Sequence, residues 1–450
     1  MGQRPADSNH TLRTLLAEAG WTHAELARAV NAAGAENGLA LRYDRSSVAH
    51  WIRGTRPRPE VGPLIAEVFT RRLRRAVDAA DLGWSDRPGQ TPGTWFAGPQ
   101  QDAVGRLAAL SRADAETGRH TELSRPVYSV RPVGASPWSS GPVSPGVRRV
   151  LSRRRVGDDE VRTLGDFVKV FSSFGQGYGG GAVILASCVS QVATVWLSAL
   201  STDDVHRRLL SQAARLSYLL GRMRLDEWSH GPAQQYFFLC LDLAREADDR
   251  VMYALGLRAL SAQARELDHR RQALDYAQAA VDHLDGGAAP PVRSFVHAQL
   301  AVSRADAGDR SLASASLRSA EHWGGAPYDH DPGDPFDFYP PNGLRFQKAR
   351  FHEASGEPGS AIRELRVAAE RGPEERLPRA LTRARLGALL LRQGYLEEAC
   401  AAWQGFLEDY PRLNSPRADR ELRSLRRQLR VYSKNALARS LLHRAARVAG

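Results

Sequence analysis

The sequence predicts an all-α protein with a small helical domain, a linker rich in proline and glycine, and a long array of helix pairs. Three observations predict this class. Apolar residues recur at three- and four-residue steps through most of the chain. Eight prolines fall between residues 85 and 147. Beyond residue 158, small residues recur at a regular spacing. We therefore expect domains at residues 1–84, 85–157 and 158–450, the middle one being the linker.

Four short helices are expected within residues 11–66. The first ends at Gly20, and Thr22 caps the second, with Glu25 three residues later completing a capping box. Asp44 caps the third helix, which ends at Gly54. The apolar residues expected to face the core are Leu12, Leu15, Leu16, Leu26, Ala27, Val30, Val48, Trp51, Leu64, Ile65 and Val68.

This layout resembles the lambda-repressor-like (XRE) helix-turn-helix domain. The residues that carry the resemblance are Gly20, Thr22, Leu26, Ala27, the helix Asp44–Trp51, Gly54, Pro57 and Pro59. The resemblance implies that the third helix enters the major groove of double-stranded DNA. The base contacts it implies are Arg45, Ser46, Ala49 and His50. The phosphate contacts it implies are Thr22, His23, Arg53, Arg56 and Arg58.

Two features depart from that family. An insertion of roughly Asn31–Tyr43 separates the second and third helices, where the family has a tight turn. Position 23 is His, where the family usually has Gln. These departures leave open a second interpretation, in which the module keeps the fold but does not bind DNA.

Within the linker, only about Gln100–Ala115 is expected to be helical. The glycines from Gly175 to Gly180 fit the spacing GxGxxG of dinucleotide-binding proteins. That site requires a strand immediately before the glycines, and Val161–Phe171 instead has helical periodicity. We therefore expect a glycine-rich connection between helices, no cofactor and no enzymatic activity.

Residues 182–200 form a stretch of nineteen residues without a charge, which is long enough to cross a bilayer. Its polar residues fall on one stripe, however, and its apolar residues occupy the other faces. This pattern favours a mostly buried helix over a membrane span. The stripe consists of Ser187, Ser190, Gln191, Thr194 and Ser198, and the apolar faces carry Val189, Val192, Val195, Trp196 and Leu200.

The second half of the chain contains five copies of a helix-pair pattern. Its most regular members are Ala233, Ala273, Ala313, Ala361 and Ala399, separated by 40, 40, 48 and 38 residues. In the last copy Leu386, Gly387, Gly394, Trp403 and Pro411 occupy the other diagnostic positions. The pattern resembles the tetratricopeptide repeat and predicts an α-solenoid whose concave groove binds a peptide or protein.

The gap of 48 residues contains the loop Tyr328–Pro341, with four Asp, His330 and several aromatic residues. Its prolines disrupt the spacing of a calcium-binding EF-hand loop, so we expect no metal site. The aromatic residues of the loop offer a surface for a ligand.

Charge and cysteine usage limit the remaining possibilities. The 62 Lys+Arg against 50 Asp+Glu give a formal charge of +12, but eleven basic residues against two acidic ones follow from Arg412 onward. The charge of the whole chain is therefore not an argument for DNA binding, and the cluster Arg42–Arg58 is the relevant part. Three dispersed cysteines and the lack of an apolar leader favour a cytoplasmic protein.

The combined architecture is similar to actinobacterial XRE-type regulators that carry a tetratricopeptide-repeat domain. The stretch Leu216–Ala244 and the glycine cluster Phe174–Gly181 carry this part of the resemblance. It implies a homodimeric transcriptional regulator whose solenoid senses a peptide, small ligand or protein and modulates DNA binding. The alternative is a tetratricopeptide interaction scaffold whose N-terminal module does not bind DNA.

Overall fold

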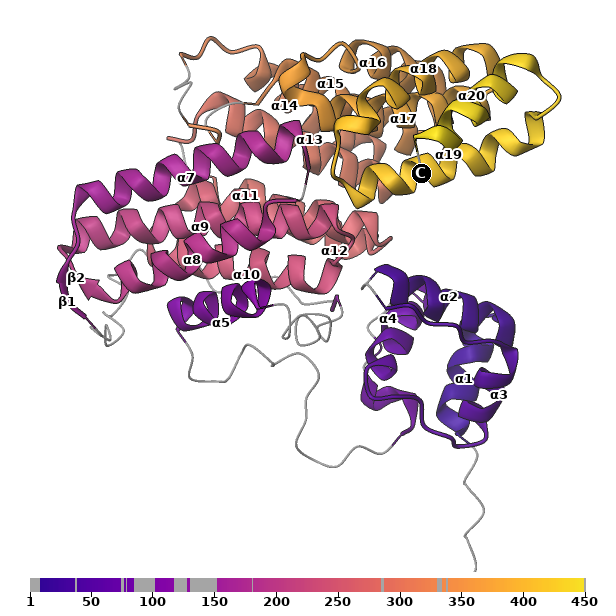
Figure 1. The fold of residues 1–450 in the computed structure, drawn as a ribbon, viewed down its shortest axis with the longest axis horizontal. Helices are drawn as coiled ribbons and strands as arrows, with labels where there is room; N and C mark the ends of the chain where they lie inside the picture. The colour runs from indigo at the N-terminus through magenta and orange to yellow at the C-terminus, as the bar shows by residue number, and fades with distance from the viewer. Residues whose placement is uncertain are drawn as a thin grey trace, which may run out of the picture.

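The computed structural model describes residues 9–36, 39–73, 77, 79–84, 102–116, 128–129, 152–179, 181–284, 287–329, 334–336 and 339–448. Figure 1 shows a helical molecule, with four helices in one small group and the remaining helices in a second, larger body. The only strands in the described ranges are β1 (Ser152–Arg155) and β2 (Ala199–Leu200), which pair in parallel. The predicted all-α class is therefore confirmed.

The small group is a four-helix module with its own apolar core. Its helices are α1 (His10–Glu18), α2 (His23–Glu36), α3 (Arg45–Ile52) and α4 (Val61–Leu73), followed by the 3-10 turn η1 (Ala79–Leu82). Asn9 links the two ends of the module, because its side chain caps α1 at Leu12 and donates 2.7 Å to the Leu82 carbonyl. All the residues predicted to face the core are buried.

The helical body begins before the repeats. Its first elements are α5 (Ala103–Ala115), α7 (Asp158–Gly177) and α8 (Val183–Leu197). Leu107 and Leu110 of α5 are buried in the same apolar core as α8 and the first repeat helices. The helix predicted in the linker therefore exists and packs on the body, while the domain boundaries themselves stay a prediction.

Six helix pairs follow α8, and each pair consists of two antiparallel neighbours joined by a short turn. The first helices are α9 (Asp203–Asp226), α11 (Arg250–Glu266), α13 (Pro290–Asp306), α15 (Pro341–Ala354), α17 (Arg376–Arg392) and α19 (Pro416–Leu429). The second helices are α10 (His230–Glu246), α12 (Arg270–Asp282), α14 (Arg310–Gly324), α16 (Pro358–Ala368), α18 (Leu396–Asp409) and α20 (Ala436–Arg447). Short 3-10 turns lie at η3 (Pro373–Glu375), η4 (Tyr410–Arg412) and η5 (Arg430–Tyr432).

The first helices form the inner row of the solenoid. From α9 to α15 each first helix contacts the next one, and α17 contacts α19. The second helices from α10 to α16 approach one another less closely. The stack therefore curves toward the first helices, as the tetratricopeptide pattern predicts (Figure 1).

The turn inside each pair repeats with the predicted period. One residue in each of the first five turns has a left-handed backbone, and each is five positions before one of the five predicted alanines. Those alanines are all buried. The register of the five repeats is therefore confirmed. The left-handed residues are Trp228, Asp268, Gly308, Gly356 and Gly394, with φ between 61° and 87°.

Large side chains fill the contact between the two helices of a pair. Trp403 of α18 is 1% exposed and donates 3.2 Å from its indole nitrogen to the Ala384 carbonyl of α17. A Cβ at Gly387 would lie 2.7 Å from that indole nitrogen. Phe237 occupies the same place against Gly221 in the first pair, where a Cβ would lie 2.6 Å from the ring. Both positions therefore require glycine, because the large aromatic side chain of the paired helix fills the space of a Cβ.

The prediction that the uncharged helix is mostly buried is wrong for one whole side of α8. Its polar stripe lies inside, where Ser187 donates 3.3 Å to Asp114 of α5 and Gln191 donates 3.4 Å to the Ser111 carbonyl. Val192 and Val195, which were expected to be covered, are 45% and 54% exposed. The stripe faces inward because α5 supplies polar partners for it. Across the described ranges, no helix is both long and apolar enough to cross a membrane.

The last repeat touches the first one. Asn414, just before α19, donates its backbone N–H 2.8 Å to the carbonyl of Tyr178, which ends α7. Ser415 donates 2.7 Å to the carboxylate of Asp226 at the end of α9. Gly179 has φ of 106°, and a Cβ there would lie 2.8 Å from the Asn414 carbonyl. The glycine-rich connection therefore serves a close backbone approach, and the element immediately before it is the helix α7, not a strand.

Candidate functional site

The first candidate surface is the outer face of α3, where base contacts were predicted. Val48 and Trp51 are 0% and 3% exposed, so the predicted inward residues are confirmed. Arg45, Ser46 and His50 are exposed on the other side, and Ala49 is partly exposed. The structure therefore brings the four predicted base-contacting residues together on one solvent-facing strip. Their contact with DNA stays a prediction.

The N-terminus of α3 is closed by a carboxylate. Asp44 accepts 2.9 Å from the Ser47 backbone N–H and 2.7 Å from the Ser46 hydroxyl. Hydrogen bonds from the hydroxyl of Ser46 and from Ser47 lower the pKa of Asp44 from 3.8 to about 2. The Ser46 hydroxyl already has a partner in this cap, so a contact with a base requires it to leave Asp44.

A second cap affects the predicted phosphate contacts at Thr22 and His23. Glu25 accepts 2.7 Å from the Thr22 backbone N–H, and the Glu25 N–H donates 3.3 Å to the Thr22 hydroxyl. The capping box is therefore confirmed. It also places an anion at the N-terminus of α2, and the hydrogen bonds from Thr22 lower the pKa of Glu25. A DNA phosphate would have to displace this carboxylate from the Thr22 N–H.

Arginines lie directly after α3. The Arg53 guanidinium donates 3.2 Å to the Ala49 carbonyl and lies 3.4 Å from the His50 ring nitrogen. Arg53, Arg56 and Arg58 are all exposed, as phosphate contacts would have to be. These residues continue the exposed basic surface that begins at Arg45.

Part of the predicted insertion is helix, because α2 continues to Glu36. The segment that follows is fixed by Asn31, whose amide donates 2.8 Å to the Tyr43 carbonyl and accepts 2.9 Å from the Tyr43 N–H. The Tyr43 ring packs edge-on against Trp51 at 4.9 Å between centroids. The spacer between α2 and α3 is therefore attached to the core of the module.

The second candidate surface is the inner row of the solenoid, where two arginines have no counter-ion. Arg258 of α11 and Arg350 of α15 make no hydrogen bond or ion pair with any described residue, and their Nε atoms are inaccessible to solvent. Burial lowers the pKa of Arg258. Burial, and then the charges of Arg265 and Arg385, lower the pKa of Arg350 further, against the opposing charge of Glu266. Both side chains keep partial solvent access.

Aromatic side chains surround Arg258. Its guanidinium carbon lies 3.7 Å from the ring centroid of Phe295 on α13, an arrangement that partly compensates a cation. Tyr339 packs on the other side of this cluster, 4.7 Å from Phe295 between centroids. Its hydroxyl is buried and has no partner among the described residues. The cluster thus presents a cation, an unpaired donor and apolar rings together.

Tyr339 belongs to the loop that the sequence singled out. Asp334 of this loop accepts 2.8 Å from Arg215 of α9, and Phe336 packs edge-on against Tyr218 at 5.4 Å. The loop therefore lies against the inner row. The described residues contain no cluster of ligands suited to a metal ion, and His330 lies outside them.

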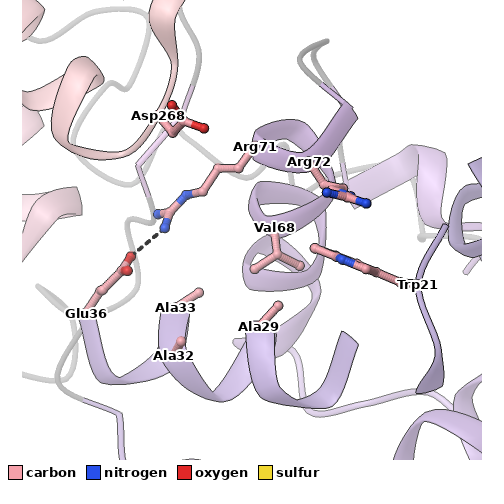
Figure 2. A pocket seen from close by; sticks show the side chains of 9 residues that line it. All are labelled: Trp21, Ala29, Ala32, Ala33, Glu36, Val68, Arg71, Arg72 and Asp268. Carbon is pink, nitrogen blue, oxygen red and sulfur yellow. Dashed lines mark hydrogen bonds and ion pairs between the residues drawn. The ribbon is translucent and has the colours of Figure 1, made fainter. Parts of the chain in front are cut away.

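A third feature is the junction between the module and the solenoid. Glu67 of α4 is buried, accepts 2.6 Å from Arg71 and lies 2.8 Å from the ring nitrogen of His269 in the α11–α12 turn. The Tyr128 ring stacks on His269 at 5.0 Å. Beside this contact is a pocket of about 330 Å³. Figure 2 shows that its walls come from α2, from α4, from Trp21 just before α2 and from Asp268 of the solenoid.

The pocket is lined by small side chains and by charges that already have partners. Arg71 donates 2.7 Å to Glu36, and the Arg72 guanidinium lies 5.8 Å from the ring centroid of Trp21 (Figure 2). The sequence did not indicate this pocket or the inner-row arginines. Both depend on which distant helices lie opposite one another, and a single arginine within a helical pattern carries no signal of that.

Comparison with known proteins gives limited similarity. A family model described as the SP15 N-terminal domain matches residues 12–85, which cover all but the first residues of the four-helix module. No curated protein matches the chain. A chain of the crystal structure of the APC/C hetero-tetramer Cut9-Hcn1 is similar over 96% of this chain and 68% of its own length, with 13% identity and a TM-score of 0.31. That score is too low to support an argument, so the solenoid assignment rests on the helix pairs themselves.

Proposed function

We propose that this protein is a non-catalytic interaction protein whose inner row binds an acidic segment of a partner protein. The observation that carries the proposal is the pair Arg258 and Arg350, which lack a counter-ion among the described residues. A charge withdrawn from water is unfavourable until an opposite charge compensates it. Arginine favours carboxylates because its planar guanidinium matches them with two parallel hydrogen bonds.

The surroundings of Arg258 favour a peptide over a free ion. Phe295 is partly exposed and offers an apolar ring to side chains, and the buried Tyr339 hydroxyl beside it has no partner among the described residues. Helical-repeat solenoids use such extended inner surfaces to bind polypeptides. An acidic polypeptide satisfies all three groups at once.

Fluorescently labelled polyglutamate is a direct probe, with polyglutamine of the same length as the uncharged comparison. We expect the full-length protein to bind polyglutamate, and the double variant Arg258→Gln, Arg350→Gln to bind it at least about tenfold more weakly, since charged hydrogen bonds contribute about 1.5–3 kcal/mol each. Arg318→Gln on the exposed side of α14 is the matched control. Equal affinity for polyglutamine, or unchanged binding by the double variant, would exclude the proposal.

A second proposed function is DNA binding by the module, in a regulator whose solenoid modulates it. The specific observation in favour is the exposed basic strip from Arg45 through Arg53 to Arg58, which has only Asp44 as an acidic neighbour within residues 42–58. The strip lies on the side of α3 opposite its buried residues. Such a face suits the major groove, with arginines at both ends to bind bases and phosphates.

This second function is tested with duplex DNA of random sequence at a series of salt concentrations. We expect the affinity to fall steeply with salt, and Arg58→Gln to reduce the slope of log K against log salt by about one. Arg13→Gln on the exposed face of α1 should leave the slope unchanged. If the protein does not bind DNA at low salt, the DNA-binding function is excluded and the interaction function remains as the only proposal.

A further inference from the structure

Two residues of the predicted linker, Tyr128 and Ser129, are held on the solenoid by side chains that lie 144 and 105 positions further along the chain. The Tyr128 side chain is 2% exposed. A segment that only connects two domains runs over the surface and leaves its side chains in water. The solenoid therefore encloses this part of the linker in the way that a binding site encloses a ligand.

Gln234 of α10 binds the backbone of Ser129 with both ends of its side-chain amide. Its carbonyl oxygen accepts 3.0 Å from the Ser129 N–H, and its amide nitrogen donates 2.7 Å to the Ser129 carbonyl. The N–H and C=O groups of one residue point to the same side in an extended chain, as they do in a pair of antiparallel strands. This contact therefore recognises an extended backbone, whatever side chain that backbone carries.

Two further side chains hold the Tyr128 ring. The ring stacks on the imidazole of His269, with 5.0 Å between the centroids and 13° between the planes. Its hydroxyl donates 2.7 Å to the side-chain carbonyl of Gln272 in α12. Burial raises the pKa of Tyr128 well above its ordinary value, so the hydroxyl stays a neutral donor. Phenylalanine would fill the same space without this hydrogen bond, so the contact favours tyrosine.

The three solenoid side chains that contact the linker are polar and buried. Gln234, Gln272 and His269 are 0%, 6% and 8% exposed. Glutamine is mostly found in contact with water, and a buried amide is unfavourable unless it is hydrogen-bonded. Both hydrogen bonds that Gln234 makes with described residues go to Ser129. The polar groups on this part of the solenoid are therefore matched to a bound peptide.

We propose that Gln234, His269 and Gln272 form a second peptide-binding site, which recognises an extended segment with a tyrosine and is filled here by the chain's own linker. A tyrosine-bearing segment of a partner protein competes with Tyr128 and Ser129 for the same atoms. The linker is favoured, because its attachment to the chain gives it a high effective concentration. The site lies on the second helices, so it goes beyond the acidic segment proposed for the inner row and the DNA proposed for α3.

Occupation of this site also affects the four-helix module. The imidazole on which Tyr128 stacks is the one whose ring nitrogen lies 2.8 Å from the Glu67 carboxylate of α4. A tyrosine from the linker or from a partner fixes the orientation of this imidazole. A vacant site leaves His269 able to turn away from Glu67, so release of the linker weakens the attachment of the module to the solenoid.

A fluorescein-labelled peptide of residues 123–133, centred on Tyr128, probes the site in the full-length protein. In the wild type the linker fills the site, whereas Tyr128→Ala removes the ring contact and the hydroxyl that hold the linker. We expect fluorescence anisotropy to show at least about tenfold tighter binding to Tyr128→Ala than to the wild type. The unlabelled peptide should raise the Tm of Tyr128→Ala and leave the Tm of the wild type unchanged.

Two altered peptides test the recognition without any change in the protein. Tyr128→Phe in the peptide removes the donor to Gln272, and a methyl group on the Ser129 nitrogen removes the donor to Gln234. Each change should weaken binding to the Tyr128→Ala protein about tenfold, because a buried acceptor loses its partner. A peptide of the same composition in scrambled order should not bind.

A second substitution in the protein locates the bound peptide. Gln234→Ala, added to Tyr128→Ala, should weaken peptide binding at least about tenfold. Gln235→Ala in the same background is the matched control, since Gln235 is the neighbouring glutamine of α10 and is partly exposed. This control should bind the peptide as tightly as Tyr128→Ala does.

Three outcomes would overturn the second peptide-binding site. These are equal binding by the wild type and Tyr128→Ala, no binding by Tyr128→Ala, and binding that tolerates both peptide changes. Polyglutamate binding by Tyr128→Ala should equal that of the wild type, because the inner row is unaltered. That measurement separates a failure of this site from a failure of the interaction function.

Discussion

Arg350 has a net cost to the stability of the free protein, because it forms no hydrogen bond or ion pair with a described residue, and burial and the charges of Arg265 and Arg385 outweigh the opposing charge of Glu266. We expect Arg350→Met, which keeps the length of the side chain, to raise the Tm by about 2–4 °C, corresponding to about 1 kcal/mol. Differential scanning calorimetry measures this shift. Arg385→Met removes the partner of Glu353 and should lower the Tm instead.

A rise in Tm together with weaker polyglutamate binding would identify Arg350 as a residue kept for binding at the expense of stability. A fall in Tm for Arg350→Met would mean that the charge is compensated within the chain, which contradicts the prediction.

His230 makes the stability of the solenoid dependent on pH. It is 1% exposed, neither ring nitrogen has a partner among the described residues, and burial lowers its pKa from 6.5 to about 4. The unfolded chain binds the proton first as pH falls. Stability is therefore complete above pH 6.5 and declines down to about pH 4, by about 3 kcal/mol in total.

Urea unfolding between pH 7 and pH 4 measures this decline. His230→Asn, which does not titrate, should reduce the pH dependence by the contribution of His230. An unchanged pH profile in that variant would assign the decline to other groups.

At the residue scale, the helical periodicity of the sequence predicts which positions are buried. It does not predict which charged residues form ion pairs. Val48, Trp51 and the five repeat alanines are buried as expected, because their spacing places them toward the core. The isolation of Arg258 and Arg350 was not predictable, since it depends on side chains from helices far away in the sequence. The sequence predicts the capping carboxylate of Glu25, but only the structure shows that it occupies the Thr22 N–H to which a phosphate would bind.

Within the last strongly patterned repeat, Gly387 and Trp403 hold α17 against α18. Gly387→Ala should lower the free energy of unfolding by about 1–3 kcal/mol, because the added Cβ meets the buried indole at 2.7 Å. Chemical denaturation with tryptophan fluorescence measures the loss. Gly359→Ala in α16 has open space around the Cβ and is the control, expected to be neutral or slightly stabilising.

At the element scale, the sequence predicts that the helices exist. It does not always predict which side of a helix packs against the body. α8 shows why, since its polar stripe turns inward to meet Asp114 and Ser111 of α5. A sequence pattern alone assigns polar residues to solvent, and only the partner helix reverses that assignment. The extension of α2 to Glu36 was missed for a similar reason, because Asn31 is occupied by a contact with the distant backbone of Tyr43.

At the whole-molecule scale, His269 positions the four-helix module against the solenoid through Glu67. We expect His269→Ala to leave both parts folded and to increase the radius of gyration and maximum dimension of the molecule, as measured by small-angle X-ray scattering. The reason is that the variant removes a buried polar contact and leaves Glu67 with Arg71 alone.

Arg270→Ala, at the neighbouring exposed position, should leave the scattering profile unchanged. A compact His269→Ala variant would mean that the module is held by other contacts.

The order of the elements along the molecule was largely predictable from the repeat spacing. The junction at His269 and the contact of Ser415 with Asp226 were not, because they join residues 202 and 189 positions apart. No local pattern encodes such pairs. This is why the solenoid was predictable, whereas the surfaces that connect its ends were not.

The contact between Ser415 and Asp226 changes how the chain reaches its native state. Open solenoids fold repeat by repeat, and each repeat depends only on its neighbours. Here the end of α9 contacts a residue that the ribosome adds 189 positions later, and such a distant contact slows folding.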